Sequence, residues 1–130
     1  MTDDNIRHLP RIGIGEAMQL FGMTARAIRF YEEKGLIEAR RDRLNSRFYD
    51  GVARERLRWI SALRAAGLPL ADIEDVLNAE DRDGGGRDCA LGKLQARRAT
   101  VQLELARVDL AVAKLDRSGS AVLAGGKARF

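Results

Sequence analysis

The sequence predicts a mainly α-helical protein, with a compact N-terminal unit that carries a small hairpin and one long helix after it. Three observations predict this fold. Apolar residues recur at helical spacing in two short runs over residues 14–34, with a turn between them. An arginine-rich segment with strand-forming residues and an Asn-Ser turn follows at 38–49. From Leu91 to Leu115, a mostly apolar pattern then alternates spacings of three and four.

Composition narrows the class of protein. The 130 residues are 45% hydrophobic and 32% charged, which is enough to form a core, and the net charge of +4 suits a polyanionic partner. No apolar run approaches the roughly 18 residues that span a bilayer, residues 1–4 do not resemble a signal peptide, and one cysteine excludes a disulfide framework. We therefore expect a cytoplasmic (nucleoid-associated) protein without a membrane contact. No nucleophile–base pair is recognisable, so neither an enzyme nor a cofactor is expected.

Composition shifts along the chain predict five segments. The glycine run at 84–86 interrupts the helical patterns and indicates a joint; no strand precedes it and no Gly-Lys-Ser/Thr follows, so it is not a phosphate-binding loop. The expected segments are a flexible arm at 1–11, a DNA-binding domain at 12–80, a linker at 81–88, a coiled-coil helix at 89–117 and a flexible tail at 118–130.

Residues 14–34 are typical of a helix-turn-helix. Gly22 ends the first helix, Thr24 can cap the second, and Gly35 suits the end of that second helix. Ile28 and Tyr31 share an inner face at i,i+3 spacing. The opposite face carries Arg26, Arg29, Phe30 and Glu33, and its two arginines and aromatic ring suit a DNA major groove. The alternative is a solvated amphipathic helix without a partner.

The arginine-rich segment at 38–49 predicts a small wing that contacts phosphates. Phosphate contacts position a protein on DNA without reading its sequence. The alternative is a solvated basic loop. The arginines that could reach phosphates are Arg40, Arg41, Arg43 and Arg47.

A third helix is expected after Asp50, which can cap it, with Leu57 and Ile60 on its buried side. Arg64 lies off that apolar stripe and is therefore available for phosphates or solvent. Trp59 is expected to pack in the core rather than to form a base-stacking platform. A short fourth helix begins near Pro69.

The long C-terminal pattern is typical of a coiled-coil seam. About 28 residues of helix would be about 42 Å long, and a seam this narrow needs a partner helix, which predicts a homodimer. Arg98 within the seam could fix its register. The alternative is a helix that folds back on its own domain. The expected seam residues are Leu91, Leu94, Arg98, Val101, Leu105, Val108, Val112 and Leu115.

Several of these segments together resemble the MerR family of bacterial transcription regulators, continuously over about residues 12–78. The resemblance rests on Ile14-Gly15-Glu16-Ala17, on Ala27-Ile28-Arg29-Phe30-Tyr31-Glu32-Glu33-Lys34-Gly35-Leu36-Ile37, on Arg47-Phe48-Tyr49, and on Ala66-Gly67-Leu68-Pro69-Leu70. It implies a winged helix-turn-helix that dimerises through an antiparallel coiled coil. It also implies binding to near-palindromic promoters, whose overlong spacer is bent and untwisted.

The resemblance also assigns DNA contacts by position, to Arg29, Phe30, Arg47, Tyr49 and Arg64. Phe30 departs from the family pattern, which has a tyrosine there, and so lacks a hydroxyl that could bind a phosphate. With the residues chosen above, the expected DNA-binding set is Thr24, Arg26, Arg29, Phe30, Tyr31, Arg40, Arg41, Arg43, Arg47, Tyr49 and Arg64.

The expected function is therefore a sequence-specific regulator whose partners are double-stranded DNA, a second copy of the chain, and RNA polymerase or another protein regulator. About fifteen residues follow the seam, too few for an effector-binding domain, so control by abundance, oligomeric state or a protein partner is expected. One alternative is an architectural, excisionase-like or developmental DNA-binding protein on direct repeats. Another is a thiol sensor at Cys89. A tight metal site is not expected because no second cysteine exists and His8 is remote in sequence.

Overall fold

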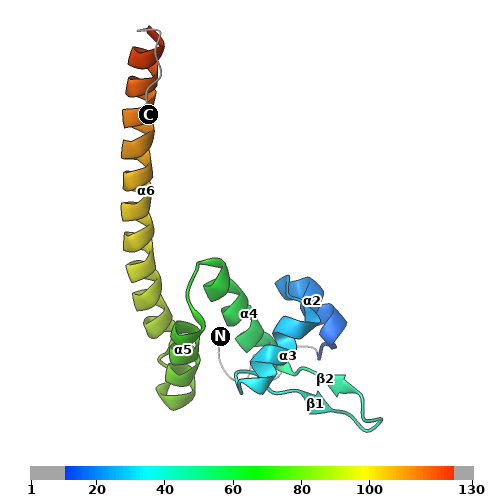
Figure 1. The fold of residues 1–130 in the computed structure, drawn as a ribbon. Coiled ribbons are helices and arrows are strands. Elements are labelled where there is room, and N and C mark those ends of the chain that lie inside the picture. The colour runs from blue at the N-terminus through cyan, green and yellow to red at the C-terminus, as the bar shows by residue number, and fades with distance from the viewer. Residues whose placement is uncertain (1–10, 125–130) are drawn as a thin grey trace. The chain divides into compact units, whose positions relative to one another are not determined.

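A computed structural model describes residues 11–124, with side chains as far as Ser118. Most of the expected N-terminal arm and the last six residues lie outside the described residues. The elements are α2 (Ile14–Phe21), α3 (Ala25–Glu33), β1 (Arg40–Arg41), β2 (Arg47–Phe48), α4 (Gly51–Ala65), α5 (Leu70–Asp83) and α6 (Gly86–Ala124) (Figure 1). The mainly α-helical class with a small two-stranded wing is confirmed. The chain divides into two units, at residues 1–94 and 95–130.

The helix-turn-helix is formed by α2 and α3. Gly22 ends α2 in the left-handed conformation (φ +61°), which a residue without a side chain adopts freely. Two residues later, the Thr24 hydroxyl oxygen accepts a hydrogen bond from the Ala27 amide at 3.1 Å. That bond satisfies one of the free amides of the first turn, and it fixes where α3 begins.

The wing is a short antiparallel ribbon tied to the start of the described chain. β1 and β2 pair in the register Arg40↔Phe48 and Arg41↔Arg47. Next to β2, the backbones of Ile12 and Tyr49 exchange two hydrogen bonds of 3.1 and 2.8 Å. This bridge holds the base of the ribbon against the helical unit.

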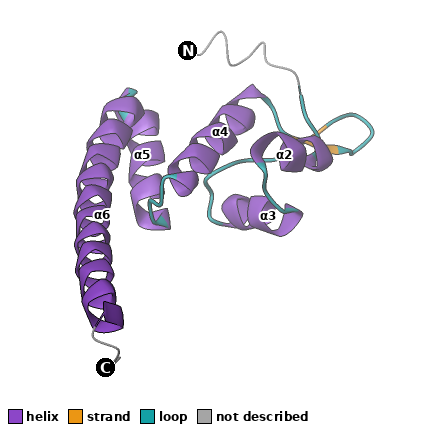
Figure 2. Ribbon diagram, turned by 90° about the horizontal axis from the view of Figure 1, so that it is seen from above, coloured by secondary structure: helices purple, strands orange, loops and turns teal. Residues whose placement is uncertain are grey.

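The core of the first unit is made mainly by α3, α4 and α5, together with side chains outside these helices such as Ile12 and Tyr49. α2 packs against α3 and α4, and α4 packs against α5 (Figure 2). Trp59 is partly buried against this core, as expected. The largest side chains with almost no exposed surface are Ile28, Tyr49, Leu57, Ile60, Ile73, Val76 and Leu77.

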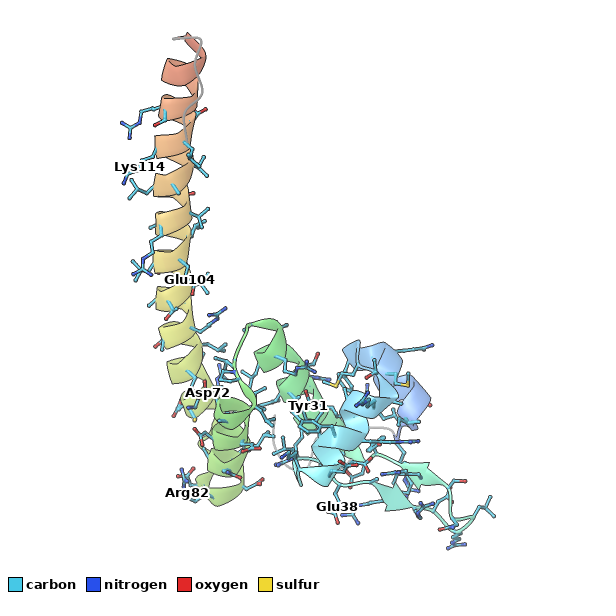
Figure 3. All side chains as sticks on the ribbon, in the orientation of Figure 1. Tyr31, Glu38, Asp72, Arg82, Glu104 and Lys114 are labelled. Atoms are coloured by element: carbon cyan, nitrogen blue, oxygen red, sulfur yellow. The ribbon has the colours of Figure 1, made fainter. Side chains whose placement is uncertain are left out.

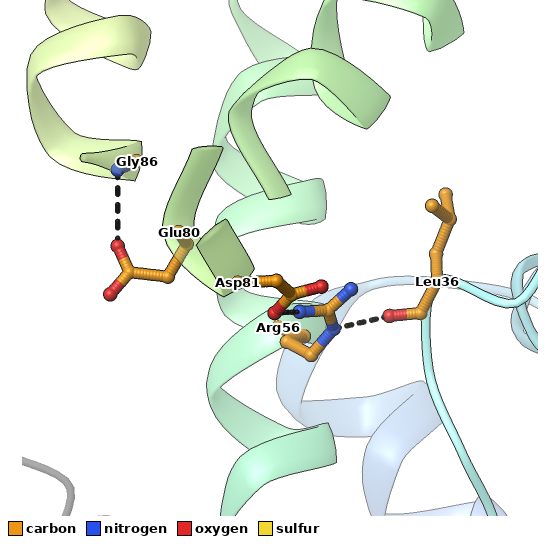
Figure 4. A network of polar contacts seen from close by, with 5 residues as sticks. All are labelled: Leu36, Arg56, Glu80, Asp81 and Gly86. Atoms are coloured by element: carbon orange, nitrogen blue, oxygen red, sulfur yellow. Dashed lines mark hydrogen bonds and ion pairs between the residues drawn. The ribbon is translucent and has the colours of Figure 1, made fainter. Parts of the chain in front are cut away.

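The expected linker at 81–88 is instead a tight corner. α5 continues to Asp83 and α6 begins at Gly86, which leaves only two glycines between the helices. The Gly86 amide donates to the Glu80 carboxylate at 3.2 Å (Figure 4). A Cβ on Gly86 would lie 2.9 Å from the Trp59 ring, so this corner requires glycine for close packing. The glycine run therefore serves a turn between packed helices.

A second polar link, in the same region, joins α4 to its neighbours. The Arg56 guanidinium donates to the Leu36 carbonyl and binds the Asp81 carboxylate at 2.8 Å (Figure 4). It thereby ties the segment after α3 and the end of α5 to α4.

The first turns of α6 belong to the N-terminal unit. Ala90 is buried, Leu94 packs against the core, and Lys93 donates to Asp72 and Asp75 of α5 at 3.1 Å each. These two hydrogen bonds raise the pKa of Lys93. The helix extends beyond the expected end at 117, because residues 118–124 of the expected tail are helical.

Candidate nucleic-acid interface

The outward face of α3 presents cations and an aromatic ring. Arg26 and Arg29 are exposed, and Ile28 between them is buried and fixes which side of the helix faces out. Phe30 is 40% exposed; its ring contacts the Tyr31 ring edge-on at 5.6 Å between centroids, and Lys34 Nζ lies 5.6 Å from its centroid. The face is thus an apolar ring among positive charges, which suits base edges and thymine methyl groups between phosphates.

Two of the expected DNA contacts lie in the core instead. Tyr31 is buried, and its ring points into the helical unit (Figure 3). Tyr49 is also buried, and its hydroxyl donates to the Glu32 carboxylate. Burial raises the pKa of the Tyr49 hydroxyl. The positive charges of Arg47 and Arg29 act to lower this pKa, but burial has the larger effect. We therefore remove Tyr49 from the candidate interface, whereas Tyr31, although mostly buried, still lines an open hollow beside α3 and stays a predicted contact.

The structure brings together four expected contacts that are up to 40 residues apart in sequence. The Arg64 guanidinium lies 5.9 Å from the centroid of the Tyr31 ring. This contact places the side chain of Arg64, a residue of α4, beside α3. An open hollow of about 520 Å³ is lined there by Thr24, Arg26, Phe30 and Arg64, among others. Two guanidiniums and a hydroxyl around one hollow can bind a phosphate.

The wing arginines differ in whether their guanidinium groups already have a partner within the described chain. Arg47 pairs with Glu32, Arg40 binds Asp50 at 2.8 Å, and Arg41 donates to the Asn45 carbonyl at 2.9 Å. Arg43 is exposed, and within residues 11–118 no hydrogen bond or ion pair engages it. It is therefore the wing cation with the most freedom to meet a phosphate.

Sequence reasoning missed one cation of the wing. The Arg11 guanidinium lies 4.4 Å from the centroid of the Phe48 ring. Residue 11 was expected in the flexible arm, because no local pattern announces the single bridge between Ile12 and Tyr49 that places it beside β2. A long-range backbone pairing of one residue leaves no periodicity to detect.

The described residues include a free cysteine but neither a cluster that could hold a metal ion nor a membrane-spanning helix. Between residues 11 and 118, no three His, Cys, Asp or Glu side chains come together to hold a metal ion. Cys89 is half-buried near the start of α6 and packs against the core. In the part of the chain that the structure describes, no helix has the length and apolarity to cross a membrane.

Comparison with known proteins decides the family. The model of the MerR HTH family regulatory protein matches residues 12–80, and that of the MerR DNA-binding region matches residues 54–117. The chain belongs to the MerR family. Among curated proteins, the HTH-type transcriptional regulator CueR of Bacillus subtilis is 33% identical over 81 residues, which cover 62% of this chain and 57% of that protein. This MerR chain spans a little over half the length of the curated relatives that it matches.

Solved MerR structures share the fold over most of the chain. The transcription regulator PbrR691 from Ralstonia metallidurans CH34, in complex with lead(II), is 32% identical with a TM-score of 0.58, covering 82% of this chain and 86% of that one. HiNmlR, a MerR family regulator lacking the sensor domain and bound to promoter DNA, has a TM-score of 0.63 over 91% and 92% of the two chains. At 18% identity, this second likeness supports the fold alone.

Proposed function

We propose that this MerR protein is a transcription regulator that binds a near-palindromic promoter site as a homodimer and acts by distorting the promoter DNA. The observation that carries the proposal is the exposed cationic face of α3, held by the same compact unit as an arginine-bearing wing. The curated relative named above, CueR of Bacillus subtilis, is a transcriptional regulator, which supports this function.

In the proposed complex, α3 enters the major groove. Arg29 and Arg26 reach base edges or phosphates from its outer face, while Phe30 contributes apolar contact. Arg64, Thr24 and the wing arginines then bind the flanking backbone. The phosphate contacts set position and the α3 contacts set sequence preference.

The homodimer is proposed from the second unit. In the single chain, its large seam side chains from Val101 to Leu115 remain 41–62% exposed. An antiparallel partner, as the family resemblance implies, would cover this exposed seam with the same residues of a second copy of the chain. Such a dimer matches a two-fold DNA site.

Distortion is proposed as the way in which binding becomes regulation. Bending or untwisting DNA requires deformation energy that depends on its sequence, and extra contacts on the deformed site offset it. RNA polymerase would then read the altered spacing of the promoter elements, so it need not bind this protein directly.

Selection of bound sequences from random duplex DNA tests the proposal, with the full chain at about 150 mM salt because the salt concentration sets the phosphate contribution. We expect an inverted repeat with half-sites about two helical turns apart. Direct repeats, or AT-rich DNA without symmetry, would contradict the proposal and favour an architectural DNA-binding protein instead.

A further inference from the structure

The tip of the wing carries an unusual exposed side chain. Leu44 is 87% exposed, more than any other large hydrophobic residue of the described chain. It lies between Arg43 and Asn45, where the ribbon turns from β1 to β2. A leucine at the far end of a cationic hairpin has no core to join, so its exposure needs another account.

The backbone of the tip is fixed by hydrogen bonds. The Asp42 carboxylate accepts from the Leu44 and Ser46 amides at 2.9 Å each, and the Asn45 amide donates to the Asp42 carbonyl at 3.0 Å. Asn45 takes the left-handed conformation (φ +63°), and Arg41 donates to its carbonyl. Leu44 is therefore presented by a preorganised turn.

Positive charge surrounds this leucine. Arg41 and Arg43 flank the tip, whereas Arg40 and Arg47 are paired with Asp50 and Glu32, and a carboxylate oxygen of Asp42 is occupied by the backbone amides of the turn. An open hollow of about 640 Å³ beside the tip is lined by Arg11, Arg41, Asp42, Arg43, Leu44 and Phe48. The tip thus combines one apolar point with a surrounding group of guanidiniums.

The minor groove of DNA matches this combination. Its walls are rows of phosphates, and apolar side chains can enter it and partly unstack a base step. It is about 6 Å wide, which excludes a helix and admits a narrow tip. A protein surface is a poorer match, because a single leucine falls far short of the apolar patch that marks a protein-binding site.

We propose that Leu44 inserts into the minor groove beside the α3 site and wedges a base step, so that each wing contributes to bending the DNA. The inference rests on the proposed DNA-binding function and assigns a cause to the distortion. The cationic side chains hold the wing on the phosphates, and the leucine acts on the stacked bases.

The test compares Leu44→Ala with two other variants on the selected DNA site. One is Leu44→Met, which keeps a long apolar side chain at the tip. The other is Leu20→Ala, a matched control in which a 52% exposed leucine of α2 is shortened outside the wing. Thermal unfolding followed by circular dichroism shows that the variants remain folded.

Two readouts separate wedging from simple contact. Fluorescence of 2-aminopurine, placed in turn at each base step flanking the half-sites, reports unstacking, and energy transfer between dyes on the duplex ends reports the bend. We expect the natural protein, Leu44→Met and Leu20→Ala to raise the fluorescence at one step per half-site. Leu44→Ala should lose this rise and bend the DNA less, while its affinity changes by less than about tenfold.

The outcomes distinguish the wedge from the proposed function. If the natural protein binds and bends its site and Leu44→Ala does the same with equal unstacking, the wedge is wrong and the DNA-binding function stands. If Leu44→Ala binds more weakly without a change in bend or stacking, the leucine is a contact only, and the wedge is again wrong. If the natural protein binds no duplex in the selection, the proposed function fails first, and the wedge fails with it.

Discussion

The two units of this MerR protein differ in how much of their apolar side chains is exposed. In the first unit, Leu57, Ile60 and Ile73 are almost completely buried, and polar links such as that of Arg56 with Asp81 join the helices around them. In the second unit, Val101, Leu105 and Val112 keep about half of their surface exposed. Figure 3 shows side chains such as those of Glu104 and Lys114 projecting from this part of α6.

This difference separates what the chain does alone from what it needs a partner to do. The first unit has a core of its own and orients the α3 face without help. An isolated helix with an exposed apolar seam gains stability only when a second surface removes that seam from water. Changes in the first unit should therefore act at any protein concentration, and changes in the seam should act through association.

The largest effect is expected from charges placed within the seam. In a dimer, Leu105→Asp/Val108→Asp would put four carboxylates into the apolar seam, where burying an unpaired charge is costly. We expect a monomer at micromolar concentrations and loss of specific binding to the inverted repeat. Analytical ultracentrifugation and binding titrations measure both.

The same helix offers a matched control. Leu103 and Leu110 are 53% and 54% exposed but lie outside the seam. Leu103→Asp/Leu110→Asp adds the same charges to the same helix and should leave the dimer intact. A seam variant that stays dimeric, or a control that dissociates equally, would show that the pairing face was assigned to the wrong side of α6.

The next effect belongs to the core of the first unit. Leu57→Ala removes a fully buried side chain and should lower the free energy of unfolding by about 2–5 kcal/mol. Val52→Ala, on the exposed side of α4, should change it by less than about 0.5 kcal/mol. Urea unfolding measures both. A large dependence of the Leu57→Ala loss on protein concentration would contradict the independence of the first unit.

The sequence predicted the parts of the fold that local chemistry decides. Thr24 and Asp50 both cap helices with their side chains, at the positions expected from residue type. Heptad spacing predicted the exposed seam of α6 from Val101 to Leu115, but it could not show that Leu94, expected in the same seam, packs against the core of its own unit. The glycine run was misjudged as a flexible linker because glycine serves both mobile joints and tight contacts, and only the proximity of Trp59 to Gly86 decides between them.

The candidate interface was harder to predict because burial decides which side chains reach the surface. Tyr49 was placed on DNA by its position in the family pattern, yet the bridge to Ile12 and the bond to Glu32 hold it in the core. Arg11 gains its place over Phe48 through the same bridge. Both depend on one pairing between residues 37 positions apart, and no sequence period encodes it.

A smaller effect, on specificity, is expected at α3. Arg29→Ala should weaken binding to the selected site by about 1–3 kcal/mol if the guanidinium makes a bidentate contact with a base. Arg29→Lys keeps the charge but loses the planar fork, so it should restore affinity on random DNA without restoring discrimination. Equal losses on cognate and random duplexes would show that Arg29 binds only phosphate.

The smallest effect is expected at Arg43, the exposed wing cation without a hydrogen bond or ion pair to residues 11–118. A phosphate contact made by a free guanidinium contributes counterion release and no sequence information, so Arg43→Ala should weaken cognate and random DNA alike. The slope of log affinity against log salt should fall by about 1 for each Arg43 that meets a phosphate, which makes the change about 2 for a dimer.

Arg82→Ala is the control. Arg82 is an exposed arginine of α5 that is paired with Asp83, so the variant removes the same charge away from the wing and should leave the slope unchanged. If both variants lowered the slope equally, the effect would come from net charge, and the wing would have no specific place on the DNA backbone.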